Sequence, residues 1–302
     1  MKIAVIIPIL YSPANLLYQE AIKSFLVAWK KTSLAKTNLE FIVVFNQFSG
    51  VDFSLPKKSK NNVFHLKNRV NKGFTGAVND GVFFATKIRQ ATWCLVSNDD
   101  VLVDQDFFVE MLPQLKKNLA IVSCGVKDRD GRTQSLGMNY LMTGLTKPNL
   151  TLNINNPYFV GTAFFVSAKT IAWSFNSFGF LLAEFFFAYA EDLELALRLK
   201  KANKKVFIYQ KNLLTHFGSI TAKRGSAQQL FWGYRNLIFI LLTHWSVVKI
   251  FLFLPFLLLG QFYSLLVLFK NRHFFLYPKI IWSVIRHRTM VFSYRKLLKE
   301  QL

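Results

Sequence analysis

The sequence is short of acidic residues and of cysteine. It has 16 Asp and Glu against 38 Lys and Arg, for a formal net charge of +22, and its charged fraction of 18% lies below the usual quarter. Its two cysteines, Cys94 and Cys124, lie in apolar surroundings and have neither a paired-thiol nor a metal-ligand spacing. A disulfide scaffold and a cysteine-ligated metal are therefore not expected, and we predict two buried thiols in a reducing compartment.

The N-terminus lacks a long apolar run. An apolar stretch of five residues, 3–7, precedes Pro8, which is too short for a signal peptide. The chain as a whole is nevertheless rich in apolar residues, at 52% with 32 Phe, and its 302 residues suffice for one large or two modest domains. This excess predicts that the protein covers more apolar surface than a core of ordinary size requires.

The positive charge is concentrated in the last third of the chain. Residues 201–302 hold 16 Lys and Arg and a single acid, Glu300, and so supply +15 of the +22. A surface this basic attracts polyanions, either the phosphate headgroups of lipids or nucleic acid. The composition changes near Ser226, which predicts a domain at 1–225 and a helical region at 226–302.

An uncharged run within this basic part favours a membrane over nucleic acid. Residues 250–269 carry no formal charge and are long enough to cross a bilayer, but Pro255 and Gly260 interrupt them and basic residues flank both ends. Residues 280–298 have the pattern of one amphipathic helix with a basic face. We expect attachment at the interface of an anionic membrane, with a single span and a buried core helix as the alternatives.

Short apolar runs alternate with helical patterns in the first two hundred residues. Runs rich in β-branched or aromatic residues predict strands at 3–7, 41–45, 63–66, 93–96, 159–167 and 206–209. Apolar residues at helical spacing predict helices at 16–26, 77–85 and 191–200. This alternation predicts an open, doubly wound, mostly parallel α/β sheet, whose ligands bind beyond the carboxyl ends of the strands.

Two groups of acids stand out in so basic a chain. Asn98-Asp99-Asp100 follows a predicted strand, and Glu191-Asp192 opens a predicted helix. Such acids bind a cation or move a proton, although Asn and Asp also form turns and acids also offset the dipole at a helix start. For Glu194 we prefer a structural role, as the i,i+4 partner of Arg198. Gly161 stands where a larger side chain would obstruct a ligand.

The order of the motifs resembles that of family-2 glycosyltransferases over residues 2–219, in particular the rhamnosyltransferase-like branch that builds bacterial surface polysaccharides. The resemblance rests on a first strand ending in Pro8, on Asn71-x-Gly73-Phe74 followed by Asn79-x-Gly81, on Asn98-Asp99-Asp100, and on Tyr189-Ala190-Glu191-Asp192 followed by Arg198. It implies the GT-A fold, which is Rossmann-like, and an inverting transfer from a nucleotide sugar to a polysaccharide or a polyprenyl-linked glycan.

The resemblance also implies roles for single residues. Asp100 is the expected ligand of a divalent metal, Mg²⁺ or Mn²⁺, and His216 is expected to complete the metal shell. Asp192 is the expected general base, with Glu191 as the second choice. Contacts with the nucleotide sugar are expected from Pro8, Asn46, Asn71, Gly73, Asn79, Asn98 and Asp99.

Two positions depart from the family pattern. Phe45 stands where the second strand usually ends in a base-reading Asp, so that Asn46 would have to replace that contact, and Leu182-Ala183-Glu184 replaces a Phe-Asp-Glu run. These departures leave a non-catalytic module of a membrane polysaccharide-assembly complex as the alternative function. We prefer a metal-dependent glycosyltransferase at the cytoplasmic face of the cell membrane, with no nucleic-acid partner.

Overall fold

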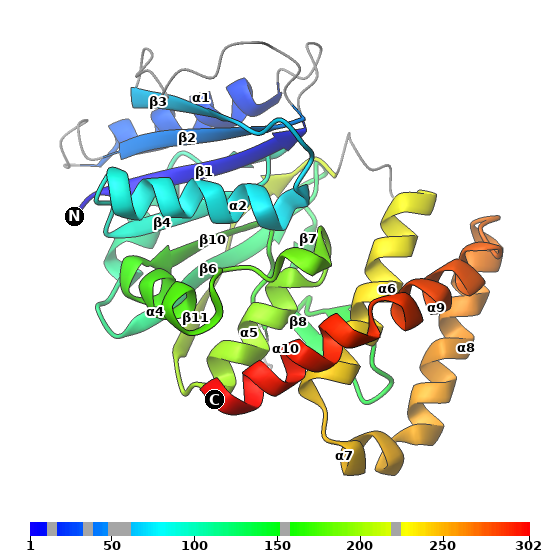
Figure 1. Cartoon of the computed structure of the whole chain (residues 1–302). Coiled ribbons are helices and arrows are strands. Elements are labelled where there is room, and N and C mark those ends of the chain that lie inside the picture. Colours follow the sequence, from blue (N-terminus) through cyan, green and yellow to red (C-terminus); the bar gives the residue numbers. More distant parts are fainter. Residues whose placement is uncertain (11–16, 33–38, 48–61, 152–157, 219–224) are drawn as a thin grey trace.

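The computed structural model describes residues 1–10, 17–32, 39–47, 62–151, 158–218 and 225–302 (Figure 1). The strands are β1 (Ile3–Leu10), β2 (Leu39–Asn46), β3 (Val63–Lys67), β4 (Trp93–Ser97), β5 (Val101–Val103), β6 (Leu119–Lys127), β7 (Thr133–Ser135), β8 (Met138–Tyr140), β9 (Thr146–Pro148), β10 (Ala163–Ser167) and β11 (Lys205–His216). The α-helices are α1 (Leu17–Lys30), α2 (Gly73–Phe83), α3 (Phe107–Met111), α4 (Ala168–Phe178), α5 (Glu191–Lys201), α6 (Ala227–His244), α7 (Val247–Leu252), α8 (Leu254–Lys270), α9 (Leu276–Arg286) and α10 (Arg288–Gln301).

Nine strands in the described ranges form one mixed sheet, in the order β3-β2-β1-β4-β10-β6-β11-β5 with β7 beside β6. Strands β3, β2, β1 and β4 are parallel, and β6 and β11 run in the same direction, whereas β10 pairs antiparallel with both β4 and β6. The predicted α/β sheet is confirmed, and a strand lies within or across each of the six predicted ranges, although β10 begins at Ala163 and not at 159. Strands β5, β6 and β7 of this sheet are not among the predicted ones.

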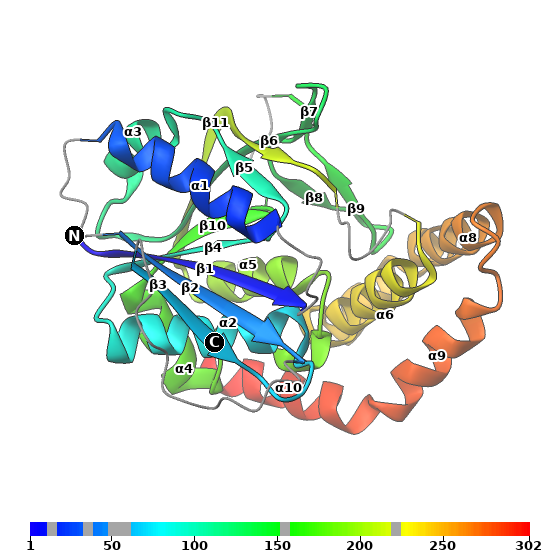
Figure 2. The ribbon, with the colours of Figure 1, turned by 90° about the horizontal axis from the view of Figure 1, so that it is seen from above.

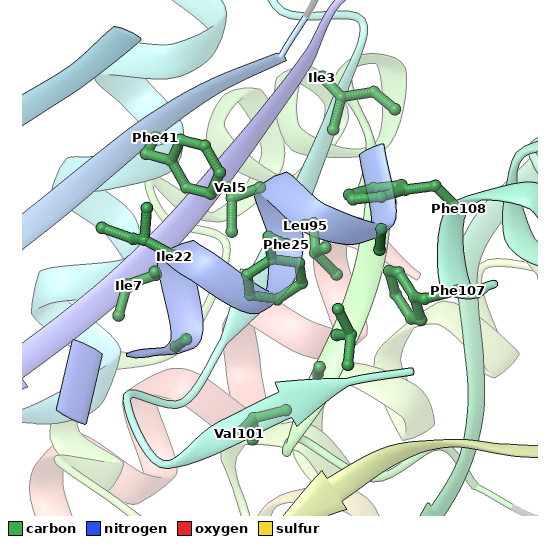
Figure 3. Packing of buried hydrophobic residues seen from close by; sticks show 14 of the residues in the cluster. Ile3, Val5, Ile7, Ile22, Phe25, Phe41, Leu95, Val101, Phe107 and Phe108 are labelled. Atoms are coloured by element: carbon green, nitrogen blue, oxygen red, sulfur yellow. The ribbon is translucent and has the colours of Figure 1, made fainter. Parts of the chain in front are cut away.

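The side chains of β1 alternate between two cores. Ile3, Val5 and Ile7 face α1 and α3 in a core that includes Phe25 and Phe107 (Figure 3). Ala4 and Ile6 face the other side, together with residues of α2, α4 and α5. Figure 2 shows α1 and α3 on one side of β1 and β4, and α2 and α4 on the other. Because the strand is covered on both faces, its sequence is one continuous apolar run.

The two cysteines lie in these cores as predicted. Cys94 on β4 and Cys124 on β6 are buried free thiols. Burial in apolar surroundings raises the pKa of both thiols far above the usual value, so both stay protonated.

The C-terminal helices share a third core with the sheet domain. Phe239 of α6 and Val291 of α10 pack with Phe186 and Leu193 of the preceding region. The composition change near Ser226 therefore marks the start of α6, whose first turn Ser226 caps by accepting the backbone N–H of Gln229. It does not mark an end of packing, because α6 and α10 are part of the same buried interior.

A buried polar network fastens these helices to α5. The Glu194 carboxylate and the Arg198 guanidinium form a fully buried bidentate pair, at 3.0 and 3.1 Å. Tyr294 of α10 donates to Glu194 Oε1, and Nε2 of His244 at the end of α6 lies 3.5 Å from the same oxygen. The structural role predicted for Glu194 is confirmed, and it extends to the C-terminal helices.

The predicted single amphipathic helix at 280–298 is wrong. The chain instead forms α9 and α10, which meet at His287, a residue with non-helical backbone angles (φ −94°, ψ 10°). The imidazole Nδ1 of His287 lies 2.7 Å from the carbonyl of Ser283. No Pro or Gly marks this break in the sequence, so an amphipathic pattern alone could not reveal it.

The uncharged run at 250–269 is also divided. Helix α7 ends at Leu252, and Pro255 lies in the first turn of α8, the position where proline is tolerated. The buried positions of α8 are Leu257, Gly260, Ser264 and Leu268, and most of its other apolar side chains are exposed. The buried-core-helix alternative is therefore wrong. Within the described ranges, no helix combines the length and the apolar character that a membrane crossing requires.

Candidate active site

A cavity of about 520 Å³ opens at the carboxyl ends of β1, β2 and β4. The first turn of α5, the end of β11 and the start of α6 complete its wall. Ten of the eleven residues predicted from the sequence line this cavity: Pro8, Asn46, Asn71, Gly73, Asn98, Asp99, Asp100, Glu191, Asp192 and His216. Residues separated by up to two hundred positions thus meet at the edge of the sheet where a doubly wound fold binds its ligands.

Asn79 is the predicted residue that does not line the cavity. Its buried amide donates to the Leu182 carbonyl at 2.8 Å and to Glu184 Oε1 at 3.1 Å. Its oxygen accepts the backbone N–H groups of Leu181 and Leu182. Every hydrogen-bonding group of the side chain is used to hold segment 181–184 against α2. The residue is a structural anchor outside the cavity wall, and its predicted contact with a nucleotide sugar stays a prediction that the cavity lining does not support.

Strand pairing brings Asp100 to His216. Strand β5 begins directly after Asp100, and its first residue, Val101, pairs with His216 at the end of β11. His216 Nε2 lies 3.4 Å from Asp100 Oδ1. The other carboxylate oxygen, Oδ2, is buried and has no hydrogen-bond partner among the described residues. The pair therefore presents one nitrogen and one unused oxygen that can coordinate a metal ion.

Gln134 of β7 orients the His216 imidazole. Gln134 Oε1 lies 3.2 Å from His216 Nδ1. Because an amide oxygen only accepts, this contact places a proton on Nδ1. Nε2 faces Asp100, where it donates to the carboxylate when protonated and is available to a metal when neutral. Histidines that bind metals are held in the same way, by a partner outside the coordination shell.

The cavity is acidic although the chain is basic. Asp99, Asp100, Glu191 and Asp192 line it, and its described lining contains no Lys or Arg. Carboxylate oxygen and imidazole nitrogen suit Mg²⁺ or Mn²⁺. Groups of three or more metal-binding side chains do not occur in the part of the chain that the structure describes. Asp100 and His216 thus fit a divalent metal that would complete its shell with water or with oxygens of a bound ligand.

Glu191 and Asp192 begin α5 and differ in their surroundings. Asp192 accepts the backbone N–H of Gly161 at Oδ2 (2.7 Å) and that of Leu193 at Oδ1 (2.8 Å). Glu191 Oε2 is buried and has no hydrogen-bond partner in the described ranges.

The different surroundings of the two carboxyl groups affect their pKa values differently. Burial and the neighbouring charge of Asp192 raise the pKa of Glu191 to about 8. Burial also raises the pKa of Asp192, but the hydrogen bonds from backbone N–H groups oppose this by stabilising its charged form. Near neutral pH Glu191 therefore keeps its proton, whereas the backbone N–H groups favour the charged form of Asp192.

A comparison with known protein families supports the function that this geometry suggests. The profile of glycosyl transferase family 2 matches residues 5–172, which is more than half of the chain. The chain belongs to glycosyl transferase family 2. It is a glycosyltransferase, as its motifs indicated, whereas the rhamnosyltransferase-like branch stays a prediction.

Solved structures of S. aureus TarS share the fold of this glycosyltransferase. The complex of TarS 1–349 with UDP-GlcNAc is 14% identical, with a TM-score of 0.54 over 99% of this chain and 91% of TarS 1–349. The complex of TarS 1–349 with UDP is 16% identical, with a TM-score of 0.50 over 82% of this chain and 67% of the other. These likenesses establish a GT-A-like fold. Curated proteins gave no match.

Helix α6 of the glycosyltransferase holds the segment before α5 in a strained conformation. Phe187, Tyr189 and Ala190 have φ angles of 66°, 69° and 64°, which are uncommon for residues other than glycine. The amide of Asn236 donates to the carbonyls of residues 186, 188 and 189 at 2.7–2.9 Å. The neighbouring Arg235 donates to the carbonyls of residues 185 and 186, both at 3.0 Å. Strain of this kind persists only where surrounding contacts determine the backbone.

Gly73 supports the same segment from the opposite side. Its φ of 71° is left-handed, and a Cβ at this position would lie 2.3 Å from the carbonyl oxygen of Phe187. Glycine is therefore required both for the turn and for the close approach of two backbones. Asn71 accepts the Gly73 N–H at 2.9 Å and so fixes this turn.

The position that departs from the family pattern lies away from the cavity. Phe45 packs against Tyr18 and His65, with ring centroids 5.9 and 5.3 Å apart. The next residue, Asn46, does line the cavity, but it already donates to the Gly73 carbonyl at 2.9 Å and accepts from Asn68 at 3.2 Å. Recognition of a nucleotide base by Asn46 stays a prediction.

Sequence reasoning missed several residues of the cavity wall, among them Gln134, Phe187 and Trp232. Gln134 gave no signal, because its short strand lies in a polar region. Phe187 and Trp232 stack with ring centroids 5.0 Å apart, and the buried Trp232 Nε1 has no hydrogen-bond partner among the described residues. Helical spacing offered a signal for Trp232, since Gln228 lies one turn before it on the same face of α6.

Proposed function

We propose that this enzyme is an inverting, metal-assisted glycosyltransferase that moves a sugar from a nucleotide-sugar donor to a hydroxyl of a polysaccharide or polyprenyl-linked glycan. The observation that carries the proposal is one cavity that contains both the Asp100–His216 pair and the carboxylate of Asp192. Such a cavity can stabilise a leaving diphosphate at one place and accept a proton at another.

A nucleotide sugar is the donor that the fold supports best. S. aureus TarS, whose structure is similar, is solved in complex with UDP and with UDP-GlcNAc. The cavity of about 520 Å³ has a suitable size for a small-molecule site and lies at the carboxyl ends of the parallel strands. The stacked Phe187 and Trp232 offer an aromatic surface for a sugar or a base.

Asp100 and His216 would hold the metal, with Gln134 fixing the His216 tautomer. When bound, a divalent metal neutralises the negative charge that builds up on the diphosphate as its bond to the sugar breaks. The need for such charge compensation follows from the cavity itself, because Asp99, Asp100 and Asp192 line it beside the protonated Glu191, without any Lys or Arg among the described lining residues. An acidic wall of this kind repels a diphosphate that enters alone.

Asp192 is the proposed general base. It takes the proton of the acceptor hydroxyl while the hydroxyl oxygen attacks the anomeric carbon from the face opposite the diphosphate. The bond from the sugar to the diphosphate breaks, the nucleoside diphosphate leaves, and the anomeric configuration inverts. Glu191 remains protonated near neutral pH, because its pKa is raised to about 8, and so leaves this role to Asp192.

We place the enzyme at the cytoplasmic face of an anionic membrane. Support comes from the exposed apolar side chains of α8 and from the excess of basic residues in the last third of the chain. Lipid-linked glycans lie at such a surface, so attachment would bring the enzyme to its acceptor.

The substitution Asp192→Asn tests the proposal. We expect it to lower sugar transfer by about a hundredfold or more, because the amide cannot take a proton, while donor affinity changes little. Turnover and calorimetry would be measured with a panel of nucleotide sugars, including UDP-GlcNAc, with and without Mn²⁺. Retained turnover in Asp192→Asn would refute the role of the base, and absence of binding by the wild type to every donor would refute the proposed donor class.

A further inference from the structure

A second cavity, of about 490 Å³, lies at the opposite end of α6 from the active site. The active-site cavity includes Gln228 and Trp232 near the start of α6, whereas the second cavity includes His244 and Trp245 at its end. The two cavities have no lining residue in common. Along the helix axis, the 16 steps from Gln228 to His244 correspond to roughly 24 Å.

The lining of the second cavity suits an anion. Lys200 and Lys201 at the end of α5 and Lys249 of α7 line it, and no Asp or Glu is found in its described lining. The nearest acid behind it is Glu194, which is already bonded to Arg198 and Tyr294. The charge of this cavity is thus opposite to that of the active-site cavity.

Buried polar groups inside the second cavity lack partners. The His244 side chain is 1% exposed, and its Nδ1 has no hydrogen-bond partner within the described structure, whereas Nε2 lies 3.5 Å from Glu194 Oε1. The hydroxyl of Tyr140 on β8 is likewise buried without a partner there. Buried polar atoms normally find a partner, so a cavity that leaves these groups unused offers them to a ligand.

The rim of the second cavity continues into an apolar surface. Leu141 and Met142 line the cavity and are exposed, and Phe251 and Leu252 of α7 are both 71% exposed. The outward side of α8 continues this surface with Leu258, Leu259, Phe262, Tyr263, Leu266 and Phe269. Figure 1 shows α7 and α8 projecting from the side of α6 that faces away from the sheet. An exposed apolar surface of this extent marks an interaction site.

We propose that the second cavity binds the phosphate headgroup of an anionic membrane lipid while α7 and α8 lie in the membrane interface. Each part of such a lipid finds a matching surface. The lysines of the rim suit its phosphate, the unused polar groups suit the polar atoms of its headgroup, and the adjoining apolar surface suits its acyl chains. Residues 226–302 contain ten Lys and Arg and one acid, so their net charge also complements an anionic membrane. The proposal rests on the proposed function for the membrane location and is independent of the sugar-transfer chemistry.

Vesicle binding by two matched triple variants tests this site. One variant replaces Lys200, Lys201 and Lys249 by Ala, and the control replaces the exposed Lys87, Lys116 and Lys117, so that both lose three positive charges. Sedimentation with phosphatidylcholine vesicles, with and without phosphatidylglycerol, measures binding. We expect the cavity variant to lose on the order of a hundredfold in affinity for the anionic vesicles and the control to stay close to the wild type. Equal losses in both variants would overturn the proposal, because charge alone would then explain binding.

Tyr140→Phe distinguishes binding inside the second cavity from binding to the surface around it. This substitution keeps the ring and the charge but removes the unpartnered hydroxyl, so we expect weaker binding to anionic vesicles and unchanged binding to neutral ones. Inorganic phosphate serves as the second probe. If the cavity variants lose inorganic phosphate but keep vesicle binding, the site serves a free phosphate and the lipid proposal is wrong. Calorimetry with UDP-GlcNAc measures donor binding at the active site separately. We expect the affinity for UDP-GlcNAc to be unaffected by these substitutions.

Discussion

The backbone N–H of Gly161 donates a hydrogen bond of 2.7 Å to Oδ2 of Asp192. A Cβ at position 161 would lie 3.1 Å from both Cβ and Oδ2 of Asp192. Gly161 lines the cavity at the place where the sequence indicated that a larger side chain would obstruct a ligand, and the space beside it is occupied by Asp192. The missing side chain therefore serves the proposed base, whose charged form the Gly161 N–H stabilises.

Gly161→Ala should impair transfer more than folding. The added methyl group displaces Asp192 by a few tenths of an ångström, and such misplacement of a reacting group lowers turnover by roughly tenfold to a hundredfold. Donor affinity, measured by calorimetry, should change little. Gly233→Ala is the control, because a Cβ there meets nothing within 4 Å, and we expect unchanged turnover with about 0.5–1 kcal/mol of added stability. Wild-type turnover in Gly161→Ala would contradict this account.

Glu191→Gln should change how stability depends on pH. The pKa of Glu191 is raised from 4.5 to about 8 in the folded protein, so between these values the unfolded chain loses a proton that the folded protein keeps. The wild type therefore loses stability as pH rises from 4.5 towards 8, by up to about 1.4 kcal/mol per pH unit from this residue. The Gln variant lacks this loss of stability. Its free energy of unfolding, relative to that of the wild type, should therefore increase from pH 4.5 to 8.

Urea unfolding at several pH values would measure this difference. The control is Glu20→Gln, since Glu20 is an exposed residue whose carboxylate makes only a surface contact with Lys23. Its difference from the wild type should not vary between about pH 5 and 8. A pH-independent difference for Glu191→Gln as well would show that Glu191 is not protonated in the folded protein.

The fold could be predicted from the sequence where burial is uniform. Strands β1, β2 and β4 are covered on both faces, so each is a continuous apolar run. Such a run can be recognised as a strand without knowing which strands lie beside it. The breaks between α7 and α8 and between α9 and α10 are different. Pro255 signals the first, but at the second the backbone of His287 leaves the helix without any local signal.

The site could be predicted where position in the chain fixes position in space. Asn98–Asp100 follows β4, and Asp192 begins α5, so both reach the cavity by the topology alone. Asn79 faces the other way because its amide matches four backbone and side-chain groups of segment 181–184, a pairing that depends on tertiary contact. Gln134 could not be found for the same reason, since only the pairing of β7 with β6 brings it to His216.

Asn236 should act on turnover through the backbone that carries Asp192. Asn236→Ala removes the donors that hold the strained residues 187–190, and we expect turnover to fall by at least roughly tenfold with a smaller change in donor affinity. Asn236→Asp should be as harmful, because it keeps the size but sets a carboxylate against three carbonyl oxygens. Asn62→Ala is the control, since that amide donates to the Leu39 carbonyl at the start of β2, whereas the cavity lies at the carboxyl end of this strand. A loss of stability with unchanged turnover in the folded Asn236 variants would contradict the positioning role.

Tyr294→Phe should loosen the attachment of α10 to the sheet domain. The Tyr294 hydroxyl donates to the buried carboxylate of Glu194, and hydrogen bonds to charged groups contribute about 1.5–3 kcal/mol. Tyr277→Phe is the matched control, since the Tyr277 hydroxyl makes a single bond of 3.3 Å to Gln261 at a half-buried place. We expect urea unfolding to show a loss of less than about 1 kcal/mol for that variant.

Acidification should reduce the difference between Tyr294→Phe and the wild type. Burial of Glu194 raises its pKa, but the charge of Arg198, the nearby His244 and the hydrogen bond from Tyr294 outweigh this and hold the pKa at about 2, below the usual 4.5. The stability that comes from ionised Glu194 is therefore complete above pH 4.5 and is lost as the pH falls towards 2. Without the Tyr294 hydroxyl the pKa of Glu194 rises, so the variant has less of this stability to lose. If the difference between the two proteins stays constant down to about pH 3, the hydroxyl does not stabilise the charged form of Glu194.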